Sequence, residues 1–195
     1  MDKTPLARLV SPTRTRAERA LLARATLQLD ERHELGRKMD REPKLASILD
    51  EFIGRLQRAF GSLTRVKGKR ILDIASGSNS SRSPTTGKRT AMFEPWFARL
   101  LLEIGAEPVA LDGGDLDGER FEHHHVDLGK PGALDFLAAA SFDGVQDSRL
   151  FGSPEFRKAY PRQRDHERIK AEIARQEGRV LKPDGVVIHS DIPRA

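Results

Sequence analysis

From Lys69 onward the sequence alternates short apolar runs with longer helical stretches, and this alternation constrains the fold more than any other feature. It is typical of a parallel β-sheet whose strands are joined by crossover helices. We expect a helix at 94–104 with Pro95 in its first turn, and further helices at 131–140 and 162–180. The expected strands are 70–74, 108–111, 121–126, 142–145 and 186–189.

The residues before this sheet are expected to be helical. Thr15 and Glu18 have the spacing of a capping box, and the apolar positions after them run to Leu29. A second helix has Pro43 in its first turn, carries one apolar stripe and ends at Gly61. The polar segment between them, 33–42, is expected to be a hinge or loop. We therefore expect a helical lid element at 1–68 and an α/β domain at 69–195.

Length and composition narrow the class of protein. The 195 residues suit one core with an appendage, and no apolar run is long enough to span a membrane. Because residues 1–10 lack a secretory pattern, we expect a cytoplasmic protein with no membrane partner. Cysteine is absent, which excludes disulfides, thiolate metal sites and a cysteine nucleophile.

Positive charge is concentrated in the first third of the chain. Residues 1–70 hold 17 Lys plus Arg and 9 Asp plus Glu, a net charge of +8. Residues 71–195 hold 17 and 20, a net charge of −3. Such a segment attracts nucleic acid or an anionic substrate, but it is equally typical of a solvated helix surface.

Small and acidic residues follow each expected strand. In open α/β sheets, ligands bind outside the carboxyl ends of the strands, near the point where the strand order reverses. The segments at these ends are Asp73-Ile-Ala-Ser-Gly-Ser-Asn79, Asp112-Gly-Gly114, Asp127-Leu128, Gln146-Asp147-Ser148 and Asp191.

This series resembles the class I S-adenosylmethionine-dependent methyltransferases from about Lys69 to Asp191. The family's first motif is matched by Ile71-Leu-Asp-Ile-Ala-Ser-Gly77, and the acidic end of its second strand by Val109-Ala-Leu-Asp112. Asp127, Phe142-Asp143 and Leu181-Lys-Pro-Asp-Gly185 match three further motifs in the family's order. The resemblance implies a Rossmann-like, mostly parallel sheet with S-adenosylmethionine as cofactor.

The resemblance also implies a role for each strand end. The loop Ala75, Ser76, Gly77 and Ser78, which follows Asp73, would give backbone room and hydrogen bonds to the methionine end of the cofactor. Asp112, followed by Gly113, would accept hydrogen bonds from both ribose hydroxyls. Asp127 would accept from the adenine amino group, with the Leu128 amide near the ring. Gln146 and Asp147 would lie beside the sulfonium.

The sequence departs from the family pattern in several places. Ala75 and Asn79 stand where the family often has Gly, and Asn79 is expected to take a positive φ. Residues 79–89 form an insertion that we interpret as a mobile lid, and the eight residues 113–120 are expected to form a Gly/Asp loop instead of a helix. The family's sixth and seventh strands have no counterpart before Ala195, so the N-terminal helices or a second subunit, in a homodimer, would cover the exposed sheet edge.

Three other motifs are weaker. The run 84–90 resembles the end of a phosphate-binding loop, but Arg82 replaces its first Gly and Arg89 its Ser or Thr. Of a dinucleotide fingerprint only Gly77 is present. The triplet 123–125 of histidines is expected to be structural, with no metal bound, although one of them could touch adenine.

The resulting functional hypothesis is methyl transfer to a small, anionic acceptor by alignment and exclusion of water. Where the acceptor needs deprotonation, the candidate bases are Asp147, Tyr160, His166 and Asp191. Three alternatives stay open: an RNA methyltransferase that uses the basic N-terminal segment, a non-catalytic binding module, and an S-adenosylmethionine-dependent enzyme with chemistry other than methyl transfer.

Overall fold

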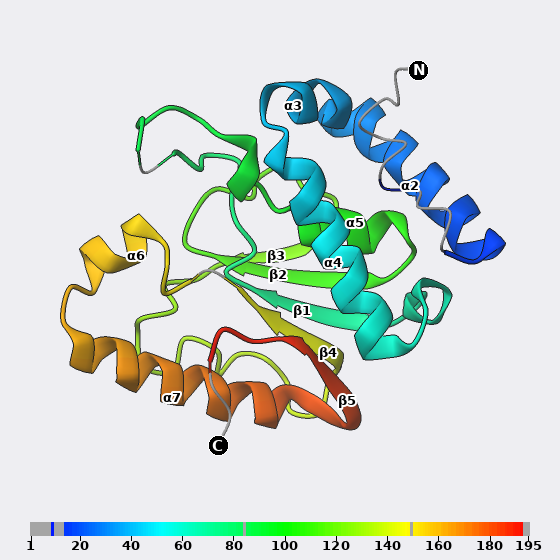
Figure 1. Cartoon of the computed structure of the whole chain (residues 1–195). Helices are drawn as coiled ribbons and strands as arrows, with labels where there is room; N and C mark the ends of the chain where they lie inside the picture. The colour runs from blue at the N-terminus through cyan, green and yellow to red at the C-terminus, as the bar shows by residue number, and fades with distance from the viewer. Residues whose placement is uncertain (1–8, 10–13, 84, 149, 193–195) are drawn as a thin grey trace.

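A computed structural model describes residues 9, 14–83, 85–148 and 150–192. Its centre is a five-stranded sheet in the order β3-β2-β1-β4-β5, with every pair of neighbours parallel (Figure 1). This confirms the α/β, Rossmann-like fold, and the strand order reverses between β1 and β4. The strands are β1 (Arg70–Ile74), β2 (Glu107–Asp112), β3 (Glu122–His125), β4 (Phe142–Asp147) and β5 (Leu181–His189).

Helices cover both faces of the sheet because alternate strand residues point to opposite faces. Ile71 packs with the N-terminal helices and α5, whereas Leu72 and Ile74 pack with α7 on the other face. The described α-helices are α2 (Arg16–His33), α3 (Leu35–Arg41), α4 (Lys44–Phe60), α5 (Trp96–Glu103), α6 (Pro154–Ala159) and α7 (Gln163–Val180), and two 3-10 turns are η1 (Leu63–Val66) and η2 (Ala91–Phe93).

The capping box at the start of α2 is confirmed. Thr15 Oγ1 accepts from the Glu18 amide at 3.2 Å, and Glu18 Oε2 accepts from the Thr15 amide at 3.1 Å. Glu18 also accepts from the Leu63 amide at 3.1 Å, which ties α2 to η1. Although burial alone raises the pKa of Glu18, these hydrogen bonds lower it to about 2.

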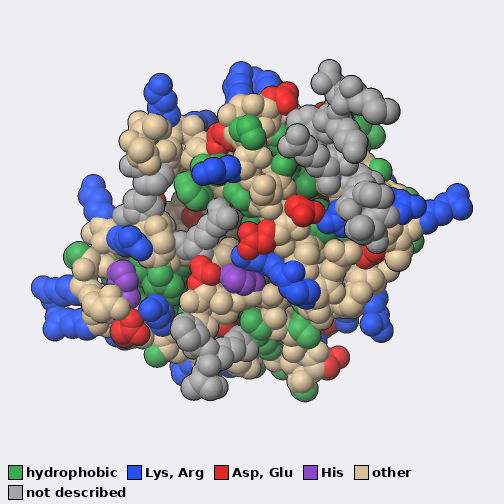
Figure 2. Space-filling view, in the orientation of Figure 1, with side chains coloured by type: hydrophobic (Ala, Val, Ile, Leu, Met, Phe, Trp, Pro, Cys, Tyr) green, Lys and Arg blue, Asp and Glu red, His purple; other side chains and the backbone are tan. Residues whose placement is uncertain are grey.

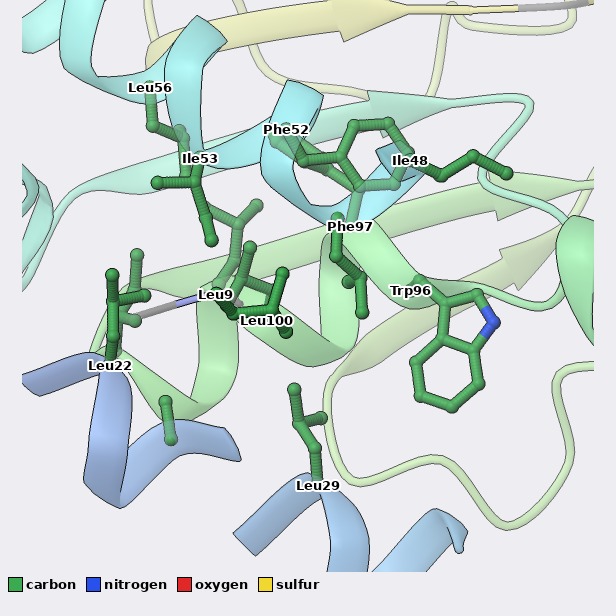
Figure 3. Packing of buried hydrophobic residues seen from close by; sticks show 14 of the residues in the cluster. Leu9, Leu22, Leu29, Ile48, Phe52, Ile53, Leu56, Trp96, Phe97 and Leu100 are labelled. Carbon is green, nitrogen blue, oxygen red and sulfur yellow. The ribbon is translucent and has the colours of Figure 1, made fainter. Parts of the chain in front are cut away.

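The N-terminal helices form part of the main core. Phe52 of α4 meets Phe97 of α5 edge to face at 5.2 Å between ring centres, and Leu22 and Leu29 of α2 lie in the same cluster (Figure 3). These helices therefore lie on one face of the sheet. The expected division at residue 68 and the second subunit at the sheet edge stay predictions.

The structure differs from the sequence expectations in three segments. The expected hinge at 33–42 contains α3, which follows Glu34 in the left-handed region with φ 54°. Residues 131–140 form successive turns and no helix, because Gly132 is left-handed with φ 72° and Arg179 binds the carbonyls of Leu134 and Leu137 at 2.9 and 2.8 Å. Strand β5 begins at Leu181, directly after α7, five residues before the start of the strand expected at 186–189.

A second helix, besides α3, was not expected. α6 begins after Ser153, whose hydroxyl accepts from the Phe156 amide at 3.3 Å, and Pro154 occupies its first turn. The pair Ser153-Pro154 is therefore the local pattern from which α6 could have been predicted. Among the described residues, no helix combines the length and the apolarity needed to cross a bilayer.

Candidate functional site

A cavity of about 1060 Å³ lies at the carboxyl edge of the sheet, next to the point where the strand order reverses. Loops after all five strands contribute to its wall, and α6 closes one side. Its lining residues are Ala75, Gly77, Ser78, Ser80, Ser81, Arg82, Phe93, Asp112, Gly113, Gly114, His125, Val126, Asp127, Leu128, Ser148, Leu150, Gly152, Ser153, Glu155, Phe156, Ala159, Tyr160 and Asp191.

Asp112 joins the loops that follow β1 and β2. Its Oδ2 accepts from the Gly77 amide at 2.9 Å, and its Oδ1 accepts from the Gly114 amide at 2.8 Å. Burial raises the pKa of Asp112, and the two amide hydrogen bonds oppose that rise. The carboxylate therefore faces the cavity in a fixed orientation.

The β1 loop packs tightly and uses its own amides. Ser76, Gly77 and Ser78 donate their N–H groups to Leu111 O at 3.1 Å, Asp112 Oδ2 at 2.9 Å and Phe93 O at 2.9 Å. Gly77 has φ 89°, and a Cβ there would overlap the Phe93 carbonyl. In this conformation these three amides are engaged within the protein, so the loop presents mainly carbonyl and hydroxyl groups to a ligand.

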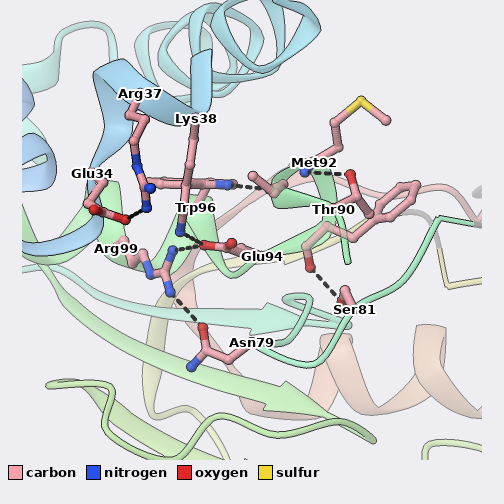
Figure 4. Close-up of polar contacts among 12 residues, drawn as sticks. Glu34, Arg37, Lys38, Asn79, Ser81, Thr90, Met92, Glu94, Trp96 and Arg99 are labelled. Carbon is pink, nitrogen blue, oxygen red and sulfur yellow. Dashed lines mark hydrogen bonds and ion pairs between the residues drawn. The ribbon is translucent and has the colours of Figure 1, made fainter. Parts of the chain in front are cut away.

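Besides Gly77, the residue with positive φ in this loop is Ala75, at 58°, and the expectation for Asn79 is wrong. Asn79 is instead fixed through its side chain, whose Oδ1 accepts from Arg99 Nη2 at 2.7 Å. Arg99, 4% exposed, also binds Glu119 and Glu94 at 2.6 Å each, and Lys38 of α3 reaches Glu94 at 2.6 Å (Figure 4). This network anchors the start of the 79–89 insertion.

Asp127 faces the cavity from the segment after β3. Its Oδ1 accepts from the Tyr160 hydroxyl at 2.7 Å and from the Gly129 amide at 3.1 Å. Burial, and then the hydrogen bond to Asp127, raise the pKa of Tyr160 to about 12. At neutral pH Tyr160 is therefore a hydrogen-bond donor.

Some expected site residues do not line the cavity. Asp73 and Gln146 lie in the sheet, 1% and 0% exposed, where Gln146 Nε2 donates to Asp73 at 3.4 Å. Arg55 of α4 is also buried, and its Nη1 donates to Gln146 Oε1 at 3.4 Å. Burial raises the pKa of Asp73 to about 8. The two side chains form a polar connection between the sheet and α4 and do not reach the ligand cavity.

Asp147, Ser76 and His166 are also absent from the lining. Asp147 is 1% exposed, and its Oδ1 accepts from the Asp191 amide at 3.0 Å. His166 packs against Phe156 and its Nε2 contacts the Tyr160 carbonyl at 2.6 Å. Of the four candidate bases, the structure therefore brings only Tyr160 and Asp191 to the cavity wall.

Several lining residues were not identified from the sequence. Arg82 and Phe93 lie in or after the insertion, and Phe156 belongs to the unexpected α6. Of the three histidines only His125 lines the cavity, while His123 contacts the Phe121 carbonyl at 3.0 Å. Within the described part of the chain, no group of three His, Asp or Glu side chains is placed to hold a metal ion.

Comparison with known proteins adds no family assignment. No protein-family model matches the sequence, and no curated protein matches it significantly. The fold and the geometry of this cavity are therefore the basis for a functional proposal.

Proposed function

We propose that the protein is an S-adenosylmethionine-dependent methyltransferase that binds its cofactor in this cavity. The observation that carries the proposal is that Asp112 and Asp127, from neighbouring strands, line one cavity at the carboxyl edge of the sheet. Asp112 pairs with His125, two residues before Asp127, so one strand spacing of about 4.8 Å and a rise of about 6.6 Å separate the two positions. The resulting distance of roughly 8 Å suits opposite ends of one nucleoside.

The polar groups fit the nucleoside part of the cofactor. A carboxylate has about four lone-pair sites, and Asp112 uses two of them for Gly77 and Gly114, which leaves acceptor capacity for a ribose diol. Asp127 Oδ2 forms no hydrogen bond within the described residues and can accept from an exocyclic amine. Phe156, Leu150 and Val126 provide apolar surface for a ring.

The methionine part needs acceptors for its ammonium and a donor for its carboxylate. The β1 loop offers carbonyl oxygens, since its amides are already engaged. Arg82 is the one lining residue, among those described, with a permanent positive charge. It would hold the carboxylate, while Asp112 orients the ribose.

The cofactor supplies an activated methyl group on its sulfonium. The protein's contribution is to align an acceptor with that methyl group and to exclude water. Because the pKa of Tyr160 is about 12, its hydroxyl would orient a substrate and would not remove a proton at neutral pH. Asp191, which lines the cavity, is the remaining candidate base for an acceptor that must lose a proton.

Isothermal titration with S-adenosylmethionine and S-adenosylhomocysteine tests the cofactor. Asp112→Ala should weaken binding roughly 10- to 150-fold, the effect of losing about 1.5 to 3 kcal/mol of charge-assisted hydrogen bonding. The matched control is Asp117→Ala, an exposed carboxylate outside the cavity. The absence of binding at millimolar cofactor, or equal affinity of both variants and the original chain, would contradict the proposal.

A further inference from the structure

Two segments at the mouth of the cavity carry only positive charge. Residues 82–89 hold Arg82, Lys88 and Arg89, and residues 157–164 hold Arg157, Lys158, Arg162 and Arg164, with no Asp or Glu in either segment. We call these seven side chains the cationic rim. Both segments belong to residues 71–195, whose net charge is negative, so the summed charge does not reveal them.

All seven rim side chains are exposed, and within the described residues none of them forms an ion pair. The basic N-terminal segment differs, because many of its cations have acidic partners. Arg14, Arg32 and Lys38, for example, bind Asp50, Glu103 and Glu94 at 2.6, 2.9 and 2.6 Å. The rim therefore keeps its charge available to a partner.

Both segments contribute residues to the cavity wall. Arg82 lines the cavity directly, and a bridge between Arg82 and Arg89 holds the two arms of the 79–89 loop together. In the second segment Ala159 and Tyr160 line the wall, as does the preceding Phe156, and Arg157 and Lys158 lie between them in the sequence. Figure 1 places the loop and α6 on the same side of the molecule, and Figure 2 shows Lys and Arg side chains projecting there.

The positions of the rim cations favour a long polyanion over a small anion as the ligand. A small anionic substrate needs a cation inside the cavity, where water is excluded. Six of the seven rim cations lie outside the cavity lining and are exposed, where each adds little to the binding of one small charge. A chain of phosphates that crosses the mouth would meet both segments at once.

We propose that the cationic rim binds single-stranded nucleic acid and that one base enters the cavity. Five of the seven rim cations are Arg, which suits phosphate recognition, and Phe93, Phe156 and Tyr160 offer aromatic rings inside the cavity. The role of that base as the methyl acceptor rests on the proposed function, whereas the binding itself does not. The proposal replaces the small acceptor expected from the sequence.

Fluorescence anisotropy with a labelled, mixed-sequence RNA of about 16 nucleotides tests the proposal on the full chain without cofactor. The rim variant is Lys88→Ala, Arg89→Ala and Arg162→Ala combined, which removes cations from both segments and leaves Arg82, the proposed partner of the cofactor carboxylate, in place. The matched control, Arg58→Ala, Arg65→Ala and Lys67→Ala, removes three exposed cations without ion pairs from α4 and the segment before β1. Circular dichroism and thermal unfolding of both variants establish that each is folded.

The rim variant should lower affinity on the order of 100-fold at 0.1 M salt and reduce the slope of log K against log salt by about 2, since each phosphate contact contributes about 0.7. The control should bind like the original chain. Equal weakening of both variants, an unchanged slope, tighter binding of a duplex of the same length, or displacement by polyglutamate as effective as by unlabelled RNA would each overturn the proposal.

The result of the RNA-binding experiment can be interpreted independently of the cofactor titration. RNA binding without cofactor affinity supports the rim and contradicts the methyltransferase. Cofactor affinity without rim-dependent RNA binding supports the enzyme and contradicts the nucleic-acid acceptor.

Discussion

The Tyr160 hydroxyl donates a hydrogen bond of 2.7 Å to Asp127 Oδ1 and thereby joins the segment after α6 to the segment after β3. Arg168 of α7 strengthens the same junction by donating to the Gly129 carbonyl at 2.9 Å. Because Asp127 faces the proposed adenine end of the cavity, any ligand there must share this carboxylate with Tyr160 or displace it. The position of α6 and the access to the cavity are therefore connected through one hydrogen bond.

Tyr160 is the only tyrosine in the chain, so its ionisation can be followed by ultraviolet absorbance. We expect a pKa of about 12 in the folded protein and about 10 in denaturant. Asp127→Asn should lower the folded-state pKa, because it removes the negative charge beside the hydroxyl, while burial keeps the pKa above 10. Asp117→Asn is the control, and equal pKa values in the two variants would contradict the assigned contact.

Gly129 makes the contact between Tyr160 and Asp127 sterically possible. A Cβ at Gly129 would overlap the Tyr160 ring, so Gly129→Ala should displace the ring and destabilise the protein by about 1 to 3 kcal/mol. Gly178 lies inside α7, and a Cβ there meets nothing within 4 Å. Gly178→Ala should therefore stabilise by about 0.5 to 1 kcal/mol. Urea unfolding that shows both variants shifted in the same direction would contradict this pair of predictions.

The fold could be predicted because periodicity is a local property of the sequence. Four short apolar runs and the stretch 121–126 predicted the five strands, and the acidic residues Asp112 and Asp127 predicted two of the lining residues. The helix expected at 131–140 was wrong because the conformation of Gly132 and the Arg179 contacts from α7 decide that segment. Such contacts are tertiary and leave no local pattern.

The site was harder to predict because motif position does not fix side-chain direction. Asp73 and Asp112 both lie in the expected strand-end motifs, but Asp73 is buried within the sheet near Arg55 and Asp112 reaches the cavity. The cationic rim was missed for a different reason. Its two segments are separated in the sequence by β2, β3 and β4, and only folding brings both to the cavity. A sum of charges along the chain therefore assigns them to the acidic region 71–195.

Arg99 holds the β1 loop and the insertion in place, and its removal should lower the free energy of unfolding substantially. The side chain is 4% exposed and balances Glu119, which is also 4% exposed, and Glu94. Arg99→Met would leave these carboxylates without their main partner, and we expect a loss of about 3 to 5 kcal/mol in stability. Arg120→Met, at a side chain 57% exposed and 3.4 Å from Glu103, should cost less than about 1 kcal/mol. Denaturant unfolding of the two variants provides the comparison, and similar losses would contradict a structural role for the Arg99 network.

The buried carboxyl of Asp73 should make stability depend on pH. Burial raises its pKa from 3.8 to about 8, and its Oδ2 has no hydrogen-bond partner among the described residues. Between these two pH values the folded state holds a proton that the unfolded state has released. The contribution of Asp73 is therefore fully present below pH 3.8 and is lost progressively as the pH rises to about 8.

Asp73→Asn replaces the protonated carboxyl by a neutral side chain of similar shape and should remove this dependence. We expect the variant and the original chain to unfold at similar urea concentrations near pH 4, and the variant to be the more stable of the two above pH 8, where the original chain carries a buried negative charge. Asp117→Asn, at an exposed position, controls for the change in net charge. An advantage of Asp73→Asn that is the same at both pH values would show that the carboxyl does not titrate between them, and a variant less stable at high pH would show that Arg55 and Gln146 require the charge.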